Sequence, residues 1–310
     1  MPRERCVIYG GGGFIGSHVA EELLKHGIGV SVFDKRNASR RNVEHIADEI
    51  DFVEGDFMNP VDQRESLQGH DYAIHLVSTT IPATSNQNPL YDVETNLIST
   101  LQFLEACVQQ KIRRTVFISS GGTVYGNPVK LPIREDHPTN PTCSYGIVKL
   151  AIEKYLALYR QQGLDYLILR LANPFGERQN PHVGQGLIVS LLHDIKQAQR
   201  VEIWGDGTTI RDFFYIKDGA KAVIRSLKYS GAQAVFNIAS GKGLSVNRIL
   251  DEFRKTLRLK FDVSYLPSRT FDVQRNVLDI SLARKELKWR PETSLKQGLQ
   301  RTWRYILDHE

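Results

Sequence analysis

Cysteine is scarce in this chain of 310 residues, and its scarcity excludes two common ways of stabilising a fold. The three cysteines are Cys6, Cys107 and Cys143, an odd number without the spacing of metal ligands. A disulfide framework or a zinc site needs paired or regularly spaced cysteines. The sequence therefore predicts a protein of the reducing cytoplasm that has no metal site.

Long apolar runs and blocks of basic residues are also missing. The stretch MPRERCVIYG holds no apolar run of signal-peptide length, and no window approaches the roughly 18 continuous apolar residues of a membrane span. The net charge is +5, but the basic residues are scattered and are not interleaved with aromatic ones. We therefore expect neither a membrane nor a nucleic acid as partner, and a dianionic nucleotide ligand accounts for a few surplus cations.

The first half of the chain contains a regular alternation of β-rich and helical stretches. CVIY, VSVFD, YAIHLV and TVFISS resemble strands, and helical patterns such as FIGSHVAEELLKHG separate them. This alternation predicts an α/β fold of the Rossmann type, a doubly wound parallel sheet with helices on both faces. After residue 174 glycine, proline and charge become more frequent. We expect a dinucleotide-binding domain over 1–174 and a smaller α/β substrate lobe over 175–310, some segments of which return to the first domain.

A glycine-rich stretch, YGGGGFIG, follows the first strand and opens the first helix. Gly10, Gly13 and Gly16 allow a tight turn and a close approach of the backbone to a pyrophosphate, whose charge then lies at the helix N-terminus. About 20 residues further on, Asp34 ends VSVFD, where a carboxylate accepts hydrogen bonds from the adenosine ribose and repels a 2′-phosphate. The combination predicts an NAD site.

Two basic residues leave the choice of cofactor open. Lys35 and Arg36 follow Asp34 directly, and either could contact a 2′-phosphate. NADP is therefore not excluded.

Tyr145 and Lys149 form the pattern Y-x-x-x-K at the start of a long predicted helix, one turn apart on one face. A free tyrosine has a pKa of about 10 and is a poor base at neutral pH. A nearby ammonium and an oxidised nicotinamide both favour the phenolate, which makes proton abstraction from a sugar hydroxyl feasible. The pattern alone is common in helices, but here it follows a dinucleotide fingerprint and FISSGGTVYG, so we expect it to be catalytic.

These stretches and several others are similar to those of one known family over nearly the whole chain. The landmarks are GGGGFIG, GDF, IHLVS, TNLIST, SSGGTVYG, SYGIVK, RLANPFG, WGDGTTIRDFFYIKD, FNIASG and SLARKELKWRPETSLKQGL. They resemble the extended short-chain dehydrogenase/reductases, and in particular the NAD-dependent epimerase/dehydratase group that includes the UDP-glucose and UDP-galactose 4-epimerases.

The resemblance implies a nucleotide-sugar 4-epimerase, which inverts C4 of an NDP-hexose through a transient 4-keto intermediate, with NAD tightly bound and a UDP-sugar favoured. In the family, the residue matching Tyr145 takes the proton of the 4-hydroxyl while hydride leaves C4, and the residue matching Lys149 bonds the nicotinamide ribose and tunes the tyrosine. The cofactor contacts implied are Gly10, Gly13, Phe14, Ile15, Gly16, Asp34, Asp56, Phe57, Tyr145 and Lys149.

Four further residues match substrate-binding positions of the family. Asn173, Arg211 and Arg269 match positions that hold the nucleotide diphosphate, and arginine suits bidentate contact with phosphate oxygens. A surface ion pair between Arg211 and Asp212 is the alternative for Arg211, and the family pattern R-x-G-D around Arg269 reads RTFD here. Asn276 falls where a bulky tyrosine in the family restricts the pocket around C2, so we expect that N-acetylhexosamines are not excluded.

The stretch FISSGGTVYG departs from the family pattern at one position. Gly121 stands where the epimerases carry a catalytic serine or threonine. Because side chains alternate along an extended segment, Thr123 is expected to point to the same side, and we predict that its hydroxyl bonds the sugar 4-oxygen, with Ser119 and Ser120 next in line. The alternative is that Thr123 only satisfies backbone groups of a loop. Dehydratases of the group carry Thr-Asp-Glu at positions 121–123 and decarboxylases keep a glutamate at 123, so neither activity is expected.

Two other functions fit the same motifs. An NAD(P)H-dependent reductase of an NDP-4-keto-6-deoxysugar uses the same tyrosine as an acid, and a non-catalytic dinucleotide sensor uses only the first domain, although such relatives typically lose the tyrosine or the lysine. The helices around residues 92–110 and 144–161 are apolar on more than one face, which indicates burial on both sides. Family members pair these helices into a four-helix bundle, so the resemblance implies a homodimer.

Overall fold

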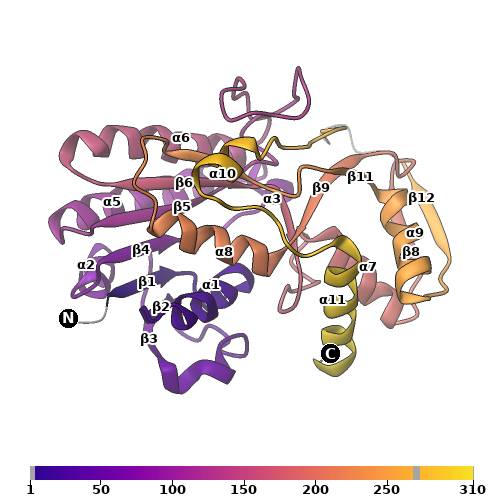
Figure 1. Ribbon diagram of the computed structural model, residues 1–310, viewed down its shortest axis with the longest axis horizontal. Coiled ribbons are helices and arrows are strands. Elements are labelled where there is room, and N and C mark those ends of the chain that lie inside the picture. Colours follow the sequence, from indigo (N-terminus) through magenta and orange to yellow (C-terminus); the bar gives the residue numbers. More distant parts are fainter. Residues whose placement is uncertain (1–3, 268–272, 310) are drawn as a thin grey trace.

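The structure is a computed structural model that describes residues 4–267 and 273–309, and its first lobe is built on a seven-stranded sheet (Figure 1). The strand order is β10-β6-β5-β4-β1-β2-β3, and every neighbouring pair is parallel. The bounds are β1 Arg5–Tyr9, β2 Gly29–Asp34, β3 Ile50–Glu54, β4 Tyr72–His75, β5 Arg114–Ser120, β6 Tyr166–Leu171 and β10 Val235–Ile238. The predicted doubly wound parallel sheet is confirmed, and its order reverses between β1 and β4, where such folds bind their ligands.

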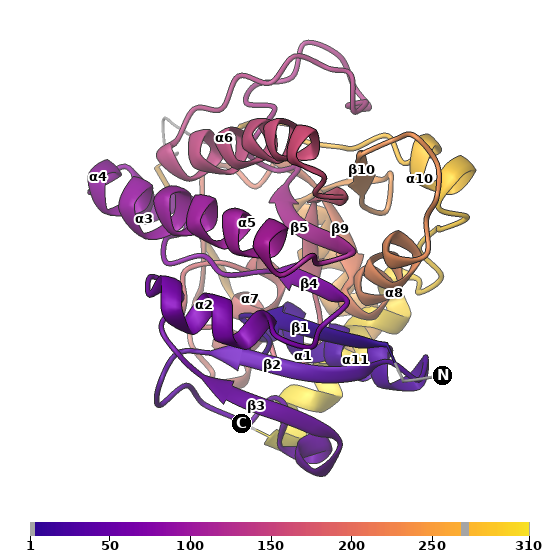
Figure 2. The same ribbon diagram turned by 90° about the vertical axis from the view of Figure 1, so that its left-hand side faces the viewer.

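Helices cover both faces of this sheet (Figure 2). On one face α1 (Phe14–Lys25) packs against α8 (Ile216–Leu227). On the other face α5 (Ser99–Gln109) packs between α2 (Pro60–Leu67) and α6 (Ser144–Tyr159). Because both faces are covered, the strands are buried on both sides, and β6 is buried along its whole length.

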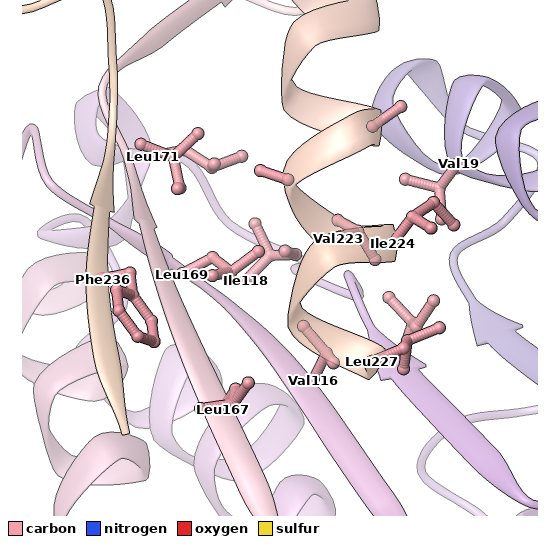
Figure 3. Close-up of a cluster of buried hydrophobic side chains, with 14 of the residues drawn as sticks. Val19, Val116, Ile118, Leu167, Leu169, Leu171, Val223, Ile224, Leu227 and Phe236 are labelled. Carbon is pink, nitrogen blue, oxygen red and sulfur yellow. The ribbon is translucent and has the colours of Figure 1, made fainter. Parts of the chain in front are cut away.

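Branched apolar side chains fill the space between the sheet and the layer of α1 and α8 (Figure 3). The labelled members come from α1, β5, β6, α8 and β10, and they are Val19, Val116, Ile118, Leu167, Leu169, Leu171, Val223, Ile224, Leu227 and Phe236. Burying one such aliphatic side chain is worth about 1.5–3 kcal/mol. This packing brings α8 and β10 back to the first lobe, although both follow strands of the second lobe in the chain.

The second lobe has two small sheets and a hydrophobic core of its own. Its sheets have the orders β11-β9-β7 and β12-β8, with the bounds β7 Asn173–Phe175, β8 Val201–Trp204, β9 Ile210–Tyr215, β11 Gly243–Ser245 and β12 Val263–Leu266. Its helices are α7 Leu187–Lys196, α9 Val246–Leu257 and α11 Leu295–His309. In Figure 1 these elements lie together at the right, beside the carboxyl ends of the large sheet's strands.

Short helices complete the chain. Single-turn helices α3 (Pro82–Ser85) and α4 (Pro89–Asp92) precede a π-helix (Val93–Ile98), which runs directly into α5. Two 3₁₀ helices span Glu44–Glu49 and Arg160–Gln162, and α10 spans Ser281–Glu286. π-Helical turns are rare in proteins, and those that occur lie frequently at functional sites. The π-helix therefore indicates that the region between β4 and α5 belongs to a functional site.

Three features of the structure concern cysteine pairing, metal binding and membrane spans. Cys6, Cys107 and Cys143 are unpaired. Within residues 4–267 and 273–309, no three His, Cys, Asp or Glu side chains gather in a way that could hold a metal ion. None of the helices in this part of the chain is both long enough and apolar enough to span a bilayer.

A buried ion pair connects α6 to the large sheet. Arg170 of β6 contacts Glu153 of α6 at 2.6 Å, and their side chains are only 6% and 4% exposed. The Ser119 hydroxyl donates to the same carboxylate at 2.5 Å, and Arg170 donates to the Tyr125 hydroxyl at 2.8 Å. Tyr125 in turn donates to Asn237 Oδ1 at 2.7 Å. The network thereby links α6 to β5, β6, β10 and the loop after β5.

Removing one partner of this pair is expected to destabilise the protein strongly. Arg170→Met should lower the free energy of unfolding by about 3–5 kcal/mol, because it leaves the Glu153 carboxylate buried and uncompensated. The double variant Arg170→Met/Glu153→Gln should recover most of that loss, since no charge then remains buried. Urea denaturation followed by circular dichroism measures both values. A double variant no more stable than Arg170→Met would contradict this account of the pair.

Candidate active site

The glycine-rich stretch forms a tight turn between β1 and α1. Gly10 has a φ of +80°, in the left-handed region that favours glycine. A Cβ on Gly16 would lie 2.5 Å from the carbonyl oxygen of Gly10, and one on Gly11 would lie 2.9 Å from Val32 Cγ1. No side chain caps the first turn of α1. A pyrophosphate could therefore approach the backbone of this turn closely. It would accept hydrogen bonds from the N–H groups at the start of α1, which the N-cap residue leaves uncapped.

Asp34 lies directly beside this turn. Its Oδ2 accepts a hydrogen bond from the Gly12 amide at 3.1 Å, and its Oδ1 accepts one from the Lys35 amide at 2.9 Å. Burial raises the pKa of Asp34, and these two amides oppose the shift. Asn42 Nδ2 donates to the Gly12 carbonyl at 3.1 Å, so the glycine turn is held from both sides.

The other residues expected to contact the cofactor differ in how far they are exposed. Asp56 is exposed, and its Oδ1 accepts a hydrogen bond from the Met58 amide at 2.9 Å. The Phe57 ring is only 7% exposed and packs in an aromatic cluster of the core. Phe14 and Ile15 are half-buried on the first turn of α1, against the core of the second lobe.

Tyr145 and Lys149 lie on the first two turns of α6, at the carboxyl end of β5. Lys149 Nζ is 5.6 Å from the centroid of the Tyr145 ring, and it donates to the Ile118 carbonyl at 3.1 Å. Burial lowers the pKa of Lys149 to about 8, with Asp92 and Glu153 partly offsetting the shift. Burial raises the pKa of Tyr145. The pair therefore combines a lysine that is still mainly cationic at neutral pH with a tyrosine that needs help to ionise.

A buried polar network, which sequence reasoning missed, positions the start of α6. The Asp92 carboxylate is fully buried and accepts hydrogen bonds from Ser144 Oγ at 2.6 Å and from Asn96 Nδ2 at 2.9 Å. Asn86 Oδ1 accepts one from the Ser144 amide at 2.8 Å. Because Ser144 precedes Tyr145, the network ties the catalytic candidate to the π-helix. TNLIST, which contains Asn96, was the available sequence signal.

Position 121 has no room for a side chain. A Cβ on Gly121 would lie 2.5 Å from Leu278 Cδ1 and 3.2 Å from the carbonyl oxygen of Arg170. Asn276 Nδ2 donates to the Gly121 carbonyl at 3.0 Å and holds the same segment in place. A side chain at 121 would therefore require Leu278 to shift and would press on the backbone of β6.

The neighbouring hydroxyls differ in what they contact. A Cβ built on Gly146, the residue after Tyr145, would lie 3.1 Å from Thr123 Cβ, so Thr123 packs against the first turn of α6. The Thr123 hydroxyl is buried and has no hydrogen-bond partner among the described residues. It therefore does not satisfy backbone groups of its loop, which was the alternative. Ser119 is committed to Glu153, and Ser120 is half-buried.

The residues expected to bind the diphosphate lie on β7 and β9. Asn173 Nδ2 donates to the Asp212 carbonyl at 3.2 Å. Arg211 is half-buried, and its Nη1 donates to the Ile210 carbonyl at 3.1 Å. The Asp212 side chain is fully buried and accepts hydrogen bonds from the Ser240 amide and hydroxyl. A pairing of Arg211 with Asp212 on the surface is therefore excluded.

Two further expected residues belong to the segment that follows β12. Asn276 is 1% exposed, and its Oδ1 is buried without a hydrogen-bond partner among the described residues. Its amide donates to the Ile210 carbonyl at 3.1 Å, which joins this segment to β9. Arg269 lies outside the described residues.

The sheet topology places these groups along one edge. The glycine turn and Asp34 follow β1 and β2, and Thr123, Tyr145 and Lys149 gather at the end of β5. Because all these strands are parallel, their carboxyl ends face the second lobe, where Asn173 and Arg211 lie. The arrangement brings a glycine turn suited to a dinucleotide, a tyrosine with a neighbouring cation, and the one basic side chain of β9, Arg211, to one edge.

Comparisons with known proteins agree with this arrangement. The model of the NAD dependent epimerase/dehydratase family matches residues 6–239. A UDP-glucose 4-epimerase of Mycolicibacterium smegmatis is 31% identical over 304 residues, which cover 96% of this chain and 97% of that protein.

Two solved structures are similar over almost their whole length. The UDP-glucose 4-epimerase of Thermotoga maritima with UDP-glucose has a TM-score of 0.92 and 32% identity, and the match covers 98% of this chain and 99% of that one. The UDP-N-acetylglucosamine 4-epimerase of Methanobrevibacter ruminantium, in complex with UDP-N-acetylmuramic acid, has a TM-score of 0.93 and 29% identity, with 100% of both chains covered. The chain belongs to the NAD dependent epimerase/dehydratase family.

Proposed function

We propose that this protein is a nucleotide-sugar 4-epimerase that acts on an NDP-hexose, with a UDP-sugar favoured. The observation that carries the proposal is the buried Thr123 hydroxyl, which packs near the Tyr145 and Lys149 pair and has no partner in the part of the chain that the structure describes. Buried polar groups are normally hydrogen-bonded, and leaving one unpaired costs about 1–3 kcal/mol. A substrate hydroxyl at this point would supply the missing bond.

NAD fits the residues at the other end of the site. The uncapped first turn of α1 and the glycine turn suit its pyrophosphate, and the Asp34 carboxylate suits its adenosine ribose. The same carboxylate disfavours a 2′-phosphate, although Lys35 follows it. Bound there, NAD would supply a hydride acceptor for C4 of the sugar and a hydride donor for the ketosugar.

Tyr145 is proposed as the group that holds and moves the proton. Its phenolate takes the proton of the sugar 4-hydroxyl during oxidation and gives it back to the 4-oxygen on reduction. Burial raises the pKa of Tyr145, so ionisation requires a nearby positive charge. The Lys149 ammonium supplies that charge, since its pKa of about 8 leaves it mainly protonated at neutral pH.

Thr123 and the residues of β7 and β9 are proposed to orient the sugar nucleotide. The Thr123 hydroxyl bonds the 4-oxygen and keeps C4 in place while the ketosugar forms. Asn173 and Arg211 contact the diphosphate, for which a guanidinium suits two oxygens at once. Asn276, next to Gly121, is proposed to lie at the sugar end of the site, where its buried Oδ1, which lacks a partner among the described residues, would accept a hydrogen bond if a substituent opened access to it.

The reaction itself can be tested with the purified protein. We expect that incubation with UDP-glucose, UDP-N-acetylglucosamine and UDP-glucuronic acid, without any reductant, yields the C4 epimer of at least one sugar, observed as new anomeric proton signals by NMR. Tyr145→Phe should keep NAD bound but lose about 10²–10⁴-fold in rate, because only proton transfer is removed. If every sugar is returned unchanged while an NDP-4-keto-6-deoxysugar oxidises NADH or NADPH, the protein is the reductase instead.

The position of the catalytic hydroxyl gives a second test. Thr123→Ala should lower kcat by about 10²–10³-fold, the cost of one lost donor at a reacting oxygen, while Thr123→Ser should remain close to the native enzyme. Ser119→Ala is the matched control, since it removes a neighbouring hydroxyl that binds Glu153 and should affect stability more than kcat.

The close contacts around Gly121 allow a further control for the Thr123 variants. Gly121→Ser in the Thr123→Ala background should not restore activity, because its Cβ would lie 2.5 Å from Leu278. A kcat unaffected by Thr123→Ala would remove Thr123 from the mechanism.

We further propose a homodimer formed through the helices around residues 92–110 and 144–161. Large apolar side chains are exposed there although the two helices already pack on each other: Leu90, Tyr91, Ile98, Ile147, Tyr155 and Leu158. Ile98 is 46% exposed and Leu158 47% exposed. An exposed apolar surface of this extent is typical of an interface, and a second copy of the chain would cover it.

Charges on this surface should separate the two copies. Ile98→Glu/Leu158→Glu is expected to sediment as a monomer at concentrations where the native protein is a dimer, because burying two carboxylates in an apolar interface is costly. Leu307→Glu, at a similarly exposed position on α11, is the control and should leave the dimer intact. Analytical ultracentrifugation decides, and a native protein that is already monomeric would exclude the proposed dimer.

A further inference from the structure

A second hollow lies on the outer surface of the helix layer, away from the groups described above. It has a volume of about 590 Å³ and is lined by the last turns of α1, by α8, and by α10 with the segment that follows it. Figure 2 shows α8 and α10 near each other on this side of the molecule. Helices of a parallel α/β fold run opposite to the strands, so the end of α1 lies toward the amino ends of the strands. The proposed sugar site is at the carboxyl ends.

Four cations that line this hollow make no hydrogen bond or ion pair with the described residues, although Arg290 and Arg225 also help to lower the pKa of Glu292 through their charge. Arg225, Arg284, Lys288 and Arg290 are exposed, and within residues 4–267 and 273–309 no hydrogen bond or ion pair engages their side chains. They come from two separate parts of the chain, α8 and the region of α10. Three of them lie in one basic stretch, ARKELKWR, and the fold brings Arg225 of α8 to the same hollow.

The two carboxylates of the hollow are already neutralised. Glu292 contacts Lys221 at 2.5 Å, and this ammonium is the main reason that the pKa of Glu292 is lowered. Glu22 contacts Lys25 at 3.5 Å. The unpaired cations are therefore left as a local excess of positive charge.

The segment after α10 is held rigidly, although it is not helical. Trp289 is 3% exposed, and its indole Nε1 donates to the Asp218 carbonyl of α8 at 2.8 Å. The Thr293 amide donates to the Asp218 carboxylate at 2.9 Å. Lys288, between α10 and Trp289, has a φ of +50°, a conformation that a non-glycine residue keeps only where its surroundings impose it. The backbone that carries Lys288 and Arg290 is thus held next to α8 before any ligand arrives, which limits the entropy lost on binding to that of their side chains.

The chemistry of these groups defines the ligand. Guanidinium groups bind phosphate oxygens in pairs, and several fixed cations favour an anion that carries several charges. The volume falls within the range of about 300–1,000 Å³ that small-ligand sites occupy. We propose that this hollow binds a small polyphosphate anion, of the kind found in a nucleoside di- or triphosphate, at a site separate from the sugar site.

Isothermal titration calorimetry tests the proposal on the 310-residue protein in an Arg211→Gln background, which removes the guanidinium proposed to hold the diphosphate in the sugar site and leaves the hollow free of any nucleotide. Inorganic tripolyphosphate, titrated at about 0.15 M salt so that long-range charge effects are screened, should bind with a stoichiometry of one per chain. Arg225→Gln/Arg290→Gln should weaken this binding at least tenfold, and Arg284→Gln/Lys288→Gln should do the same.

The control variant carries the same change in net charge at a distance. Lys255→Gln/Lys260→Gln removes two exposed cations at and beyond the end of α9, and it should bind tripolyphosphate like the native protein. Equal weakening in the control and in the hollow variants would reduce the effect to overall charge and overturn the site, as would absence of binding at millimolar tripolyphosphate. The readout is binding and not turnover, so loss of epimerase activity would not affect it.

Discussion

The ion pair between Arg170 and Glu153 is the interaction on which the rest of the site depends. Taking two charges out of water costs several kcal/mol each, and the pair is stable only because other groups complete the hydrogen bonding around it. Ser119 and Tyr125 supply those groups, and both belong to the stretch FISSGGTVYG. The segment that carries Thr123, proposed to act on the substrate, is therefore anchored to this ion pair on both sides of that residue.

The pair also determines where Tyr145 and Lys149, the proposed catalytic side chains of α6, stand. Lys149 lies one turn before Glu153, and Tyr145 lies one turn before Lys149. The ion pair that holds Glu153 to β6 therefore also determines the distance of Tyr145 and Lys149 from the sheet. The Asp92 network holds the first residue of the same helix. Because α6 is held both at Ser144 and at Glu153, Lys149 stays buried between them. Its burial is what lowers the pKa of Lys149 to about 8.

Two neighbouring positions at the end of β5 differ in their surroundings: Gly121 is crowded, and the Thr123 hydroxyl has no hydrogen-bond partner among the described residues. Leu278 and Asn276, from a segment far away in the chain, close the space around Gly121, whereas the Thr123 hydroxyl is left buried and unbonded next to Gly146. A hydroxyl is thus disfavoured at one position and available two residues further on. The same distant segment also bonds β9 through the Asn276 amide, so it joins the proposed sugar end of the site to the strand that carries Arg211.

The sequence by itself determined what depends on neighbouring residues: the alternation of strands and helices, the glycine turn with Asp34, and the one-turn spacing of Tyr145 and Lys149. These follow from backbone geometry, which repeats within each element. Only the tertiary structure decided that the Phe57 ring is buried in the core, that Leu278 closes position 121, and that cations from α8 and α10 meet over one hollow. Such contacts join residues far apart in the chain, and their existence depends on how whole elements pack, which no local pattern encodes.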